Sequence, residues 1–218
     1  MKTFNDLDVT SRKHAAYLLS ERLIALKNTD ASILAIPNGG APVGFWLAKR
    51  LNLDFNIIPC RTIQLPGSTV SIGSISVDEI NMHGDMEGIP QSFVYGQIQI
   101  VRNGVERESA YYNAIKPGKS LKGATAIIVD DVLLNSDTVI TVLKTIRKQK
   151  PERIVVAIPF VMESAARLID KEVDEFIYLY EDRYIQDIRE RIGMLPKIGR
   201  ETVRILLSDS ISQEFQRN

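Results

Sequence analysis

The 218-residue sequence is poor in the residues that build disulfides and metal sites. It contains one cysteine, Cys60, and two histidines, His14 and His83. A single cysteine excludes an internal disulfide, and two isolated histidines argue against a zinc site. Because Cys60 lies in an apolar run, we expect it to be a small buried hydrophobic side chain.

The sequence also lacks net charge and long apolar runs. Its 27 basic and 27 acidic side chains cancel, so no general attraction to nucleic acid or to a membrane surface is expected. The first 13 residues are polar and lack a signal-peptide core, and no apolar run reaches membrane-spanning length. We therefore expect a cytoplasmic protein with no nucleic-acid or membrane partner. A local basic pocket for a phosphorylated ligand is compatible with the charge balance.

What is present fits one globular domain. Hydrophobic residues make up 44% of the chain and charged residues 25%, as in ordinary globular proteins. A length of 218 residues suffices for one well-packed domain and is short for two, so we expect residues 1–218 to form a single domain.

Apolar runs alternate with amphipathic segments in the second half of the chain. This pattern predicts strands at 125–129, 153–159 and 175–180, with helices at 137–149 and 163–171. Such alternation is typical of an α/β protein with a central, mostly parallel sheet and helices on both faces. In such sheets, ligands bind beyond the carboxyl ends of the strands.

The first half is less regular. We predict helices at 11–26 and from 42 to about 51, and strands at 32–37, 55–61 and 71–77, with a loop at 64–69. Residues 83–90 and 116–123 have loop-like composition. The segment 97–108 fits either a hairpin around Asn103-Gly104 or the first half of a helix that runs to Ala114, and we favour a strand followed by a helix. The tail from Arg200 predicts a helix that docks through one apolar face.

Two aspartates, Asp130 and Asp131, come directly after the apolar strand at 125–129. Successive strand residues point to opposite sides, and a buried unpaired carboxylate costs several kcal/mol, so both are expected at the end of the strand. There they could bind the vicinal hydroxyls of a ribose or hold a divalent metal ion. Alternatively, one caps a neighbouring helix and the other is solvated.

A helix is predicted to begin shortly after this pair, in the segment Asn135, Ser136, Asp137 and Thr138. The free N–H groups and positive dipole end of a helix N-terminus favour an anion. Ser136 or Asp137 could equally be an ordinary N-cap. Two carboxylates followed by a short loop and a helix N-terminus is nevertheless the layout needed to hold a sugar phosphate.

A second loop between a strand and a helix contains Asn38, Gly39 and Gly40. Paired glycines allow backbone amides to approach an anion closely, although such a pair is often only a tight turn. Arg61, at the end of the next predicted strand, could reach the same region, and arginine suits bidentate phosphate binding. A surface ion pair is the alternative for Arg61.

The order and spacing of these segments resemble the type I phosphoribosyltransferase family. The segments are ILAIPNGGAPVGFWLAKRLNLDF at 33–55, CRTIQLPG at 60–67, SIGSI at 71–75, AIIVDDVLLNSDTV at 126–139 and RIVVAIPFV at 153–161. The likeness runs from residue 4 to 208 and is narrower to a little-characterised bacterial branch with a PRGG loop, an RK-I-G-x-PG segment and a DDG-x-ATGAT loop. It implies that family's fold, including a small accessory hood, and a homodimer.

The resemblance also implies a mechanism. Phosphoribosyl pyrophosphate (PRPP) binds with Mg²⁺, and a nucleophile displaces pyrophosphate at the anomeric carbon through an oxocarbenium-like transition state. By position, Asp130 and Asp131 become the ribose-binding acids, with a Mg²⁺ ion near them. Residues 135–138 become the 5-phosphate loop, and residues 38–40 with Arg61 become the pyrophosphate side.

The chain departs from the branch pattern at several of these positions. Asn38 replaces an arginine and Thr62 a lysine, so two cations are missing on the pyrophosphate side. Ser136 and Asp137 replace Gly-Ala, and a carboxylate about 5 Å from a phosphate charge repels it by roughly 3 kcal/mol at an effective dielectric near 20. Leu134 occupies the place of the acid that oxopurine-salvage enzymes use on the base, which disfavours oxopurine substrates.

Three functions therefore remain open at the level of sequence. The first is phosphoribosyl transfer from PRPP to an acceptor that no motif identifies. The second is a binding module of the same fold, with weakened or lost catalysis, that senses a nucleotide. A phospho-receiver domain fits less well, because its acidic pair belongs after the first strand.

Overall fold

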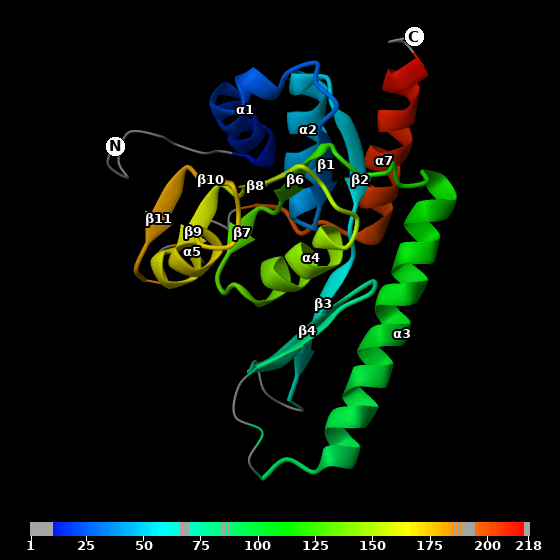
Figure 1. Cartoon of the computed structure of the whole chain (residues 1–218), viewed down its shortest axis with the longest axis vertical. Helices are drawn as coiled ribbons and strands as arrows, with labels where there is room; N and C mark the ends of the chain where they lie inside the picture. Colours follow the sequence, from blue (N-terminus) through cyan, green and yellow to red (C-terminus); the bar gives the residue numbers. More distant parts are fainter. Residues whose placement is uncertain are drawn as a thin grey trace.

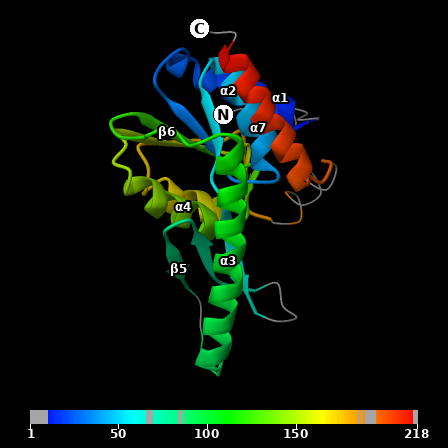
Figure 2. The same cartoon turned by 90° about the vertical axis from the view of Figure 1, so that its right-hand side faces the viewer.

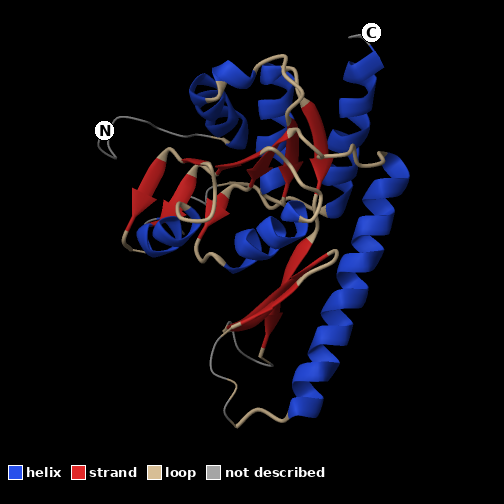
Figure 3. Ribbon diagram, viewed as in Figure 1, coloured by secondary structure: helices blue, strands red, loops and turns tan. Residues whose placement is uncertain are grey.

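We describe the protein from a computed structural model, which describes residues 11–65, 70–83, 86, 88–184, 186, 188 and 195–215. Its centre is a five-stranded, all-parallel sheet with the strand order β10–β8–β6–β1–β2. The strands are β1 (Ser32–Ala35), β2 (Asp54–Ile57), β6 (Thr125–Val129), β8 (Arg153–Ala157) and β10 (Glu175–Ile177). The expected mostly parallel α/β architecture is confirmed (Figures 1 and 3).

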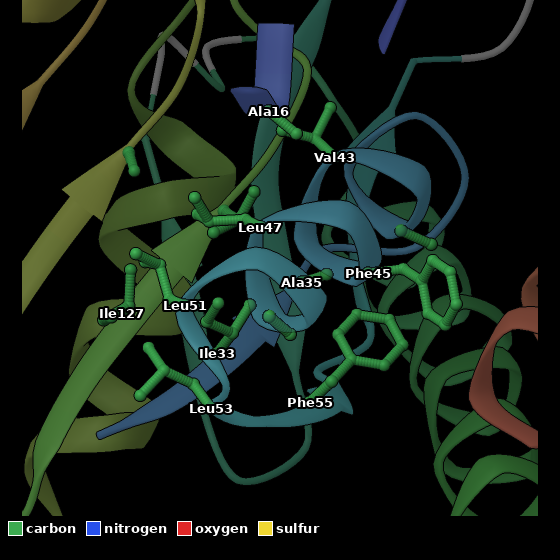
Figure 4. Close-up of a cluster of buried hydrophobic side chains, with 14 of the residues drawn as sticks. Ala16, Ile33, Ala35, Val43, Phe45, Leu47, Leu51, Leu53, Phe55 and Ile127 are labelled. Atoms are coloured by element: carbon green, nitrogen blue, oxygen red, sulfur yellow. The ribbon is translucent and has the colours of Figure 1, made fainter. Parts of the chain in front are cut away.

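Helices cover both faces of this sheet. On one face lie α1 (Arg12–Arg22), α2 (Gly40–Leu51) and α7 (Arg200–Phe215); on the other lie α4 (Asp137–Arg147) and α5 (Glu163–Ile169) (Figure 1). Strand alternation divides the core accordingly. In β1, Ile33 and Ala35 pack under α2, as Figure 4 shows, whereas Leu34 packs with the α4 cluster.

Three strands of the main sheet break and then continue into a second small sheet. After β6 comes β7 (Val132–Leu133), after β8 comes β9 (Phe160–Met162), and after β10 comes β11 (Tyr180–Asp182), paired in the order β11–β9–β7. Asp130 and Asp131 occupy the break between β6 and β7. The acidic pair therefore lies at a line where the chain leaves the main sheet.

An accessory unit is built from the middle of the chain. The strands β3 (Cys60–Gln64), β4 (Ser71–Ser76) and β5 (Ile80–Met82) form an antiparallel sheet, which packs on α3 (Gln91–Ile115) and on α4. Figure 2 shows α3 running past the body of the molecule beside α7. Ser74 fixes β4 to α4, because its hydroxyl donates to the carbonyl of Asp137 at 3.0 Å.

The structure corrects several predicted element bounds. The expected strand and helix within 97–114 are one helix, α3, and the preference for a strand there was wrong. The single strands predicted at 55–61 and 175–180 are each two strands in different sheets, β2 with β3 and β10 with β11. The helix predicted at 11–26 ends at Arg22 and is followed by a short 3-10 turn, Ile24–Leu26.

Local composition explains these corrections. Pro59, which has no N–H to donate to a strand ladder, separates β2 from β3 and lets the chain change sheets. In α3, side chains at helical spacing pack against β3 and β4; they include Val94, Ile98, Val101 and Val105. Most of the predicted loop at 64–69 lies outside the described residues. No helix in the described part of the chain is long and apolar enough to cross a membrane.

Candidate functional site

The two carboxylates of the acidic pair have different surroundings. Asp131 lies on the side of α1 and α2 and is buried, with 6% of the residue exposed. Asp130 is half-buried, and its Oδ1 accepts the backbone N–H of Asp131 at 2.8 Å. The pair thus forms one compact acidic centre at the carboxyl end of β6, as the sequence led us to expect.

The glycine loop lies directly against this centre. A Cβ atom at Gly39 would be 2.0 Å from Oδ2 of Asp131, and one at Gly40 would be 2.8 Å from the carbonyl oxygen of Val129. With contacts this close, a side chain at either position would force the loop or its neighbour to move, so space favours glycine at both positions. The structure therefore brings together two of the predicted site segments, Asn38–Gly40 and Asp130–Asp131.

Asn38 has a left-handed backbone, with φ of 70°. Asparagine tolerates this conformation better than most residues with a Cβ atom. Its side chain is exposed, and its carbonyl accepts the N–H of Ala41 at the start of α2. The N-cap residue of α2 is Gly39, which has no side chain to cap the helix. The loop therefore presents the start of α2 beside the acidic centre.

Arg12, at the first position of α1, pairs with Asp131. Its Nε and Nη2 atoms lie 2.9 and 2.8 Å from Oδ2, and its Nη1 donates to the carbonyl of Pro196 at 2.7 Å. The two side chains are only 11% and 9% exposed. The ion pair is therefore largely shielded from water, and it compensates the charge of Asp131 more strongly than a surface pair would.

The pKa of Asp130 is raised well above the usual range. Burial of its carboxyl group is the main cause, and the negative charge of Asp131 adds to it; Arg12 acts in the opposite direction. Asp130 is thus the member of the pair that tends to hold a proton. A protonated carboxyl can donate a hydrogen bond, whereas a carboxylate can only accept one.

The predicted phosphate loop follows the acidic centre and ends in α4. Ser136, the N-cap residue of α4, makes no side-chain cap bond, and Asn135 Oδ1 accepts the N–H of Asp137 at 3.2 Å. The other first-turn N–H groups have no helical partner by geometry. Asp137 directs its carboxylate to His83, with Oδ2 2.8 Å from Nε2. The negative charge that seemed to threaten anion binding is thus turned towards β5.

Arg61 has a different neighbourhood from the one predicted. On β3, Cys60 faces α4, where its thiol contacts the carbonyl of Thr138 at 3.6 Å. Arg61 points to the other side of the strand, where its Nε lies 3.0 Å from Oε2 of Glu108 on α3. Its side chain is 53% exposed. The structure places Arg61 beside α3, and its role at the pyrophosphate stays a prediction.

Leu134 and Cys60 have apolar environments. Leu134 packs with Val132 against a small cluster that contains the stacked rings of Phe160 and Tyr180. Cys60 is buried in the α4 core, as expected, and burial together with the charge of Asp130 raises its thiol pKa to about 12. Cys60 is therefore not a nucleophile near neutral pH.

The residues present fit a Mg²⁺ ion only together with a ligand. Among the described residues, no cluster of three or more histidine, cysteine or acidic side chains could hold a metal. The acidic pair is two carboxylates, one of them occupied by Arg12. Mg²⁺ is commonly bound by one or two carboxylates plus substrate phosphates, so a ligand-borne ion is compatible with this site.

Separately, a cleft of about 350 Å³ runs along β2, between that strand, α3 and α4. Its lining includes Ser32 and Asp54, the first residues of β1 and β2, and Gln149 after the end of α4. None of the predicted site residues lines it. Its volume alone therefore does not make it the functional site.

Sequence reasoning missed Arg12 and His83. Arg12 carried a signal, because a basic residue in the first turn opposes the helix dipole and so suggests a partner outside the helix. His83 carried none, since its contact with Asp137 depends on how the accessory sheet packs on α4.

Comparison with known proteins agrees with this geometry. The chain is 24% identical over 187 residues to a Mycobacterium tuberculosis protein, Rv0571c, which carries a provisional name as a phosphoribosyl transferase. That alignment covers 82% of this chain and 40% of the relative, so the chain spans less than half of the relative's length. The crystal structure of TT1426 from Thermus thermophilus has the same fold, with a TM-score of 0.75 and 22% identity over 93% of this chain and 99% of that one.

The family itself is established by a wider match. The family model described as the phosphoribosyl transferase domain matches residues 10–184, from the start of α1 to beyond β11. This range contains the glycine loop, the acidic pair and the start of α4. The chain therefore belongs to the phosphoribosyl transferase domain family.

Proposed function

We propose that the protein binds a phosphoribosyl ligand, PRPP or a nucleoside 5′-monophosphate, at the acidic centre. The proposal further assigns to it the transfer of the phosphoribosyl group from PRPP to an acceptor, with release of pyrophosphate. The observation that carries it is the contact of Gly39 and Gly40 with Asp130 and Asp131, with the α4 N-terminus following in the chain.

Each group has a distinct part in this proposal. The carboxylate of Asp131 accepts a hydrogen bond from a ribose hydroxyl. Asp130 accepts a hydrogen bond when ionised and can donate one when protonated. The N–H groups in the first turn of α4 bind the 5-phosphate. Mg²⁺, when bound with the ligand, supplies positive charge for the pyrophosphate.

The reaction breaks the bond between the anomeric carbon and a pyrophosphate oxygen, which leaves with the bonding electrons. A nucleophile of the acceptor then bonds to that carbon. Apart from the acidic pair, the protein's contribution is mainly to orient the ligand and to stabilise charge.

Titration calorimetry tests the binding site. PRPP with Mg²⁺ and, separately, adenosine 5′-monophosphate are titrated into the wild type, Asp130→Asn and Asp131→Asn. We expect each variant to bind at least about tenfold more weakly, because a charge-assisted hydrogen bond contributes about 1.5–3 kcal/mol. Asp209→Asn, an exposed carboxylate on α7, is the matched control. Unchanged affinity in both acidic-pair variants would overturn the assignment.

The second candidate is a nucleotide-sensing module with weak or no turnover. Two observations favour it: Arg12 already occupies Asp131, and the side chains of Asn38 and Thr62 carry no charge. Pyrophosphate release from PRPP separates the candidates, because a sensing module binds the nucleotide and releases none. In either case we expect a homodimer, which sedimentation would measure.

A further inference from the structure

Three arginines line a cavity of about 290 Å³ between β3, α3 and α7. The lining consists of Arg61, Gly104, Arg107, Glu108 and Arg200. Three guanidinium groups against one carboxylate leave a formal charge of +2. The cavity is thus strongly basic, although the chain as a whole has no net charge.

Two of the three charges are uncompensated. Glu108 is paired with Arg61 and also accepts from the Tyr112 hydroxyl at 3.5 Å. Arg107 donates through Nε to the carbonyl of Asn103, and Arg200 stacks on the ring of Tyr111 at 3.6 Å. Within the described ranges, neither Arg107 nor Arg200 has a carboxylate partner, so both can bind an anion.

Gly104 makes the space for this arrangement. It lies inside α3, where glycine lowers helix stability relative to alanine. A Cβ atom there would lie 3.3 Å from Nη1 of Arg61 and 3.7 Å from its Cζ. The glycine thus lets the Arg61 guanidinium lie close to the backbone of α3.

Two chain neighbours of the cavity residues make contacts at the acidic centre or in the segment that follows it. Arg61 follows Cys60, which contacts the carbonyl of Thr138 in the predicted phosphate loop. Arg12 bridges Asp131 and the carbonyl of Pro196. Pro196 and Arg200 are four residues apart, which limits their Cα separation to roughly 14 Å. Figure 2 shows α3 beside α7, and the two helices are in contact.

We propose that this cavity is a polyanion subsite that receives the pyrophosphate portion of the ligand, or free pyrophosphate, through Arg107 and Arg200. These two residues then provide, from α3 and α7, the positive charge that Asn38 and Thr62 lack. Planar guanidinium groups suit this ligand because each can bind two phosphate oxygens. The link to PRPP rests on the proposed function; the anion site itself does not.

Inorganic pyrophosphate, titrated without nucleotide, tests the subsite. We expect Arg107→Gln and Arg200→Gln each to weaken pyrophosphate binding at least about tenfold, because a charge-assisted contact is lost. Arg204→Gln is the matched control, since Arg204 lies on the same helix, pairs with Glu201 and does not line the cavity. Both test arginines are exposed, so their variants should keep the wild-type melting temperature.

Adenosine 5′-monophosphate distinguishes this inference from the proposed function. It lacks the pyrophosphate group, so its affinity should be unchanged in the two arginine variants and reduced in Asp131→Asn. Pyrophosphate that does not bind the wild type, or that binds both arginine variants as well as the wild type, overturns the subsite. An affinity for adenosine 5′-monophosphate that is unchanged in both Asp130→Asn and Asp131→Asn overturns the proposed function but not the subsite.

Discussion

Asp130 and Asp131 are neighbours in the sequence, yet their carboxyl groups have different environments. Asp131 is paired with Arg12, whereas burial and the charge of Asp131 raise the pKa of Asp130. The sequence predicted the position of both residues from the strand that precedes them. It could not predict this difference, because Arg12 is more than a hundred residues away in the chain.

The raised pKa of Asp130 predicts a measurable pH dependence of stability. In the pH range from its unfolded pKa up to its raised folded pKa, the folded state binds more protons than the unfolded state. Asp130 therefore lowers the free energy of unfolding as pH rises through that range. Asp130→Asn should remove this loss and be more stable than the wild type near neutral pH. The gain is about 1.4 kcal/mol for each unit by which the pKa is raised.

Urea unfolding of the wild type and Asp130→Asn between pH 4 and 8 would measure the effect. The difference in unfolding free energy should grow with pH and then level off above the folded pKa. Titrating groups that do not interact with Asp130 cancel in this difference. A variant less stable than the wild type at neutral pH would show that the Asp130 carboxylate is stabilised in the fold.

Gly39 provides a second prediction for a single residue. Gly39→Ala places a Cβ atom 2.0 Å from Asp131 Oδ2, so the loop or the carboxylate must move. We expect a loss of about 1–3 kcal/mol in stability, as for other overpacked sites, and weaker binding of phosphoribosyl ligands. Thermal melting and calorimetry would measure both.

Gly96→Ala is the control for this substitution. Gly96 lies in α3, and a Cβ atom there meets nothing within 4 Å. Alanine at that position should stabilise the helix by up to about 1 kcal/mol. Equal effects of the two substitutions would mean that Gly39 does not press against Asp131.

Secondary-structure elements differed in how well the sequence predicted them. Strands β1, β6 and β8 were predicted because each is a short apolar run followed by a helix with period 3.6. The antiparallel sheet was only partly predicted, because β5 has three half-buried residues and no clear alternation. The segment that forms α3 was predicted wrongly for a similar reason. Only one face of α3 packs against β3 and β4, so its composition is mixed.

At the level of secondary-structure elements, the charge at the start of α4 leads to a testable prediction. The carboxylate of Asp137, in the first turn of α4, is paired with His83, which directly follows β5. Asp137→Asn should tighten the binding of adenosine 5′-monophosphate by less than the roughly 3 kcal/mol with which a unit charge about 5 Å away repels a phosphate at an effective dielectric near 20, because the carboxylate is turned towards His83. His83→Ala should weaken it, because the carboxylate then lacks its partner.

Calorimetry at low ionic strength would measure both variants, and the double variant completes the comparison. If His83 acts only through Asp137, the double variant should bind like Asp137→Asn alone. Affinities that do not change in any of the three variants would place the phosphate elsewhere than at the α4 N-terminus.

At the scale of the whole molecule, the alternating pattern of apolar and amphipathic segments was enough to predict the main sheet and its two helical layers. The pattern could not show that three strands break and continue into a second sheet, because each break is only two residues long. Nor could it show that α3 and α7 bring Arg107 and Arg200 together with Arg61, since these residues are far apart in the chain.

Turnover depends on this whole arrangement of charge. We expect pyrophosphate release from PRPP with common purine and pyrimidine bases to be slow, because the residues at positions 38 and 62 are neutral. The arginine cavity can bind pyrophosphate in substrate and product alike, and uniform binding lowers KM without raising kcat. Loss of a charge-stabilising contact can cost roughly 2.7–4 kcal/mol of transition-state stabilisation, about a hundred- to a thousandfold in rate.

Asn38→Arg with Thr62→Lys should therefore raise kcat for pyrophosphate release, whereas Arg107→Gln with Arg200→Gln should mainly raise KM. The gain from Asn38→Arg has a structural cost, because position 38 has a left-handed backbone that arginine adopts less readily than asparagine. Thr62→Lys alone avoids that cost and serves as the comparison. A continuous pyrophosphate assay over a range of PRPP concentrations separates kcat from KM. A wild type that releases pyrophosphate with an ordinary base at several per second, within the usual range for enzymes, would show that Arg61, Arg107 and Arg200 with Mg²⁺ already supply all the charge that the reaction needs.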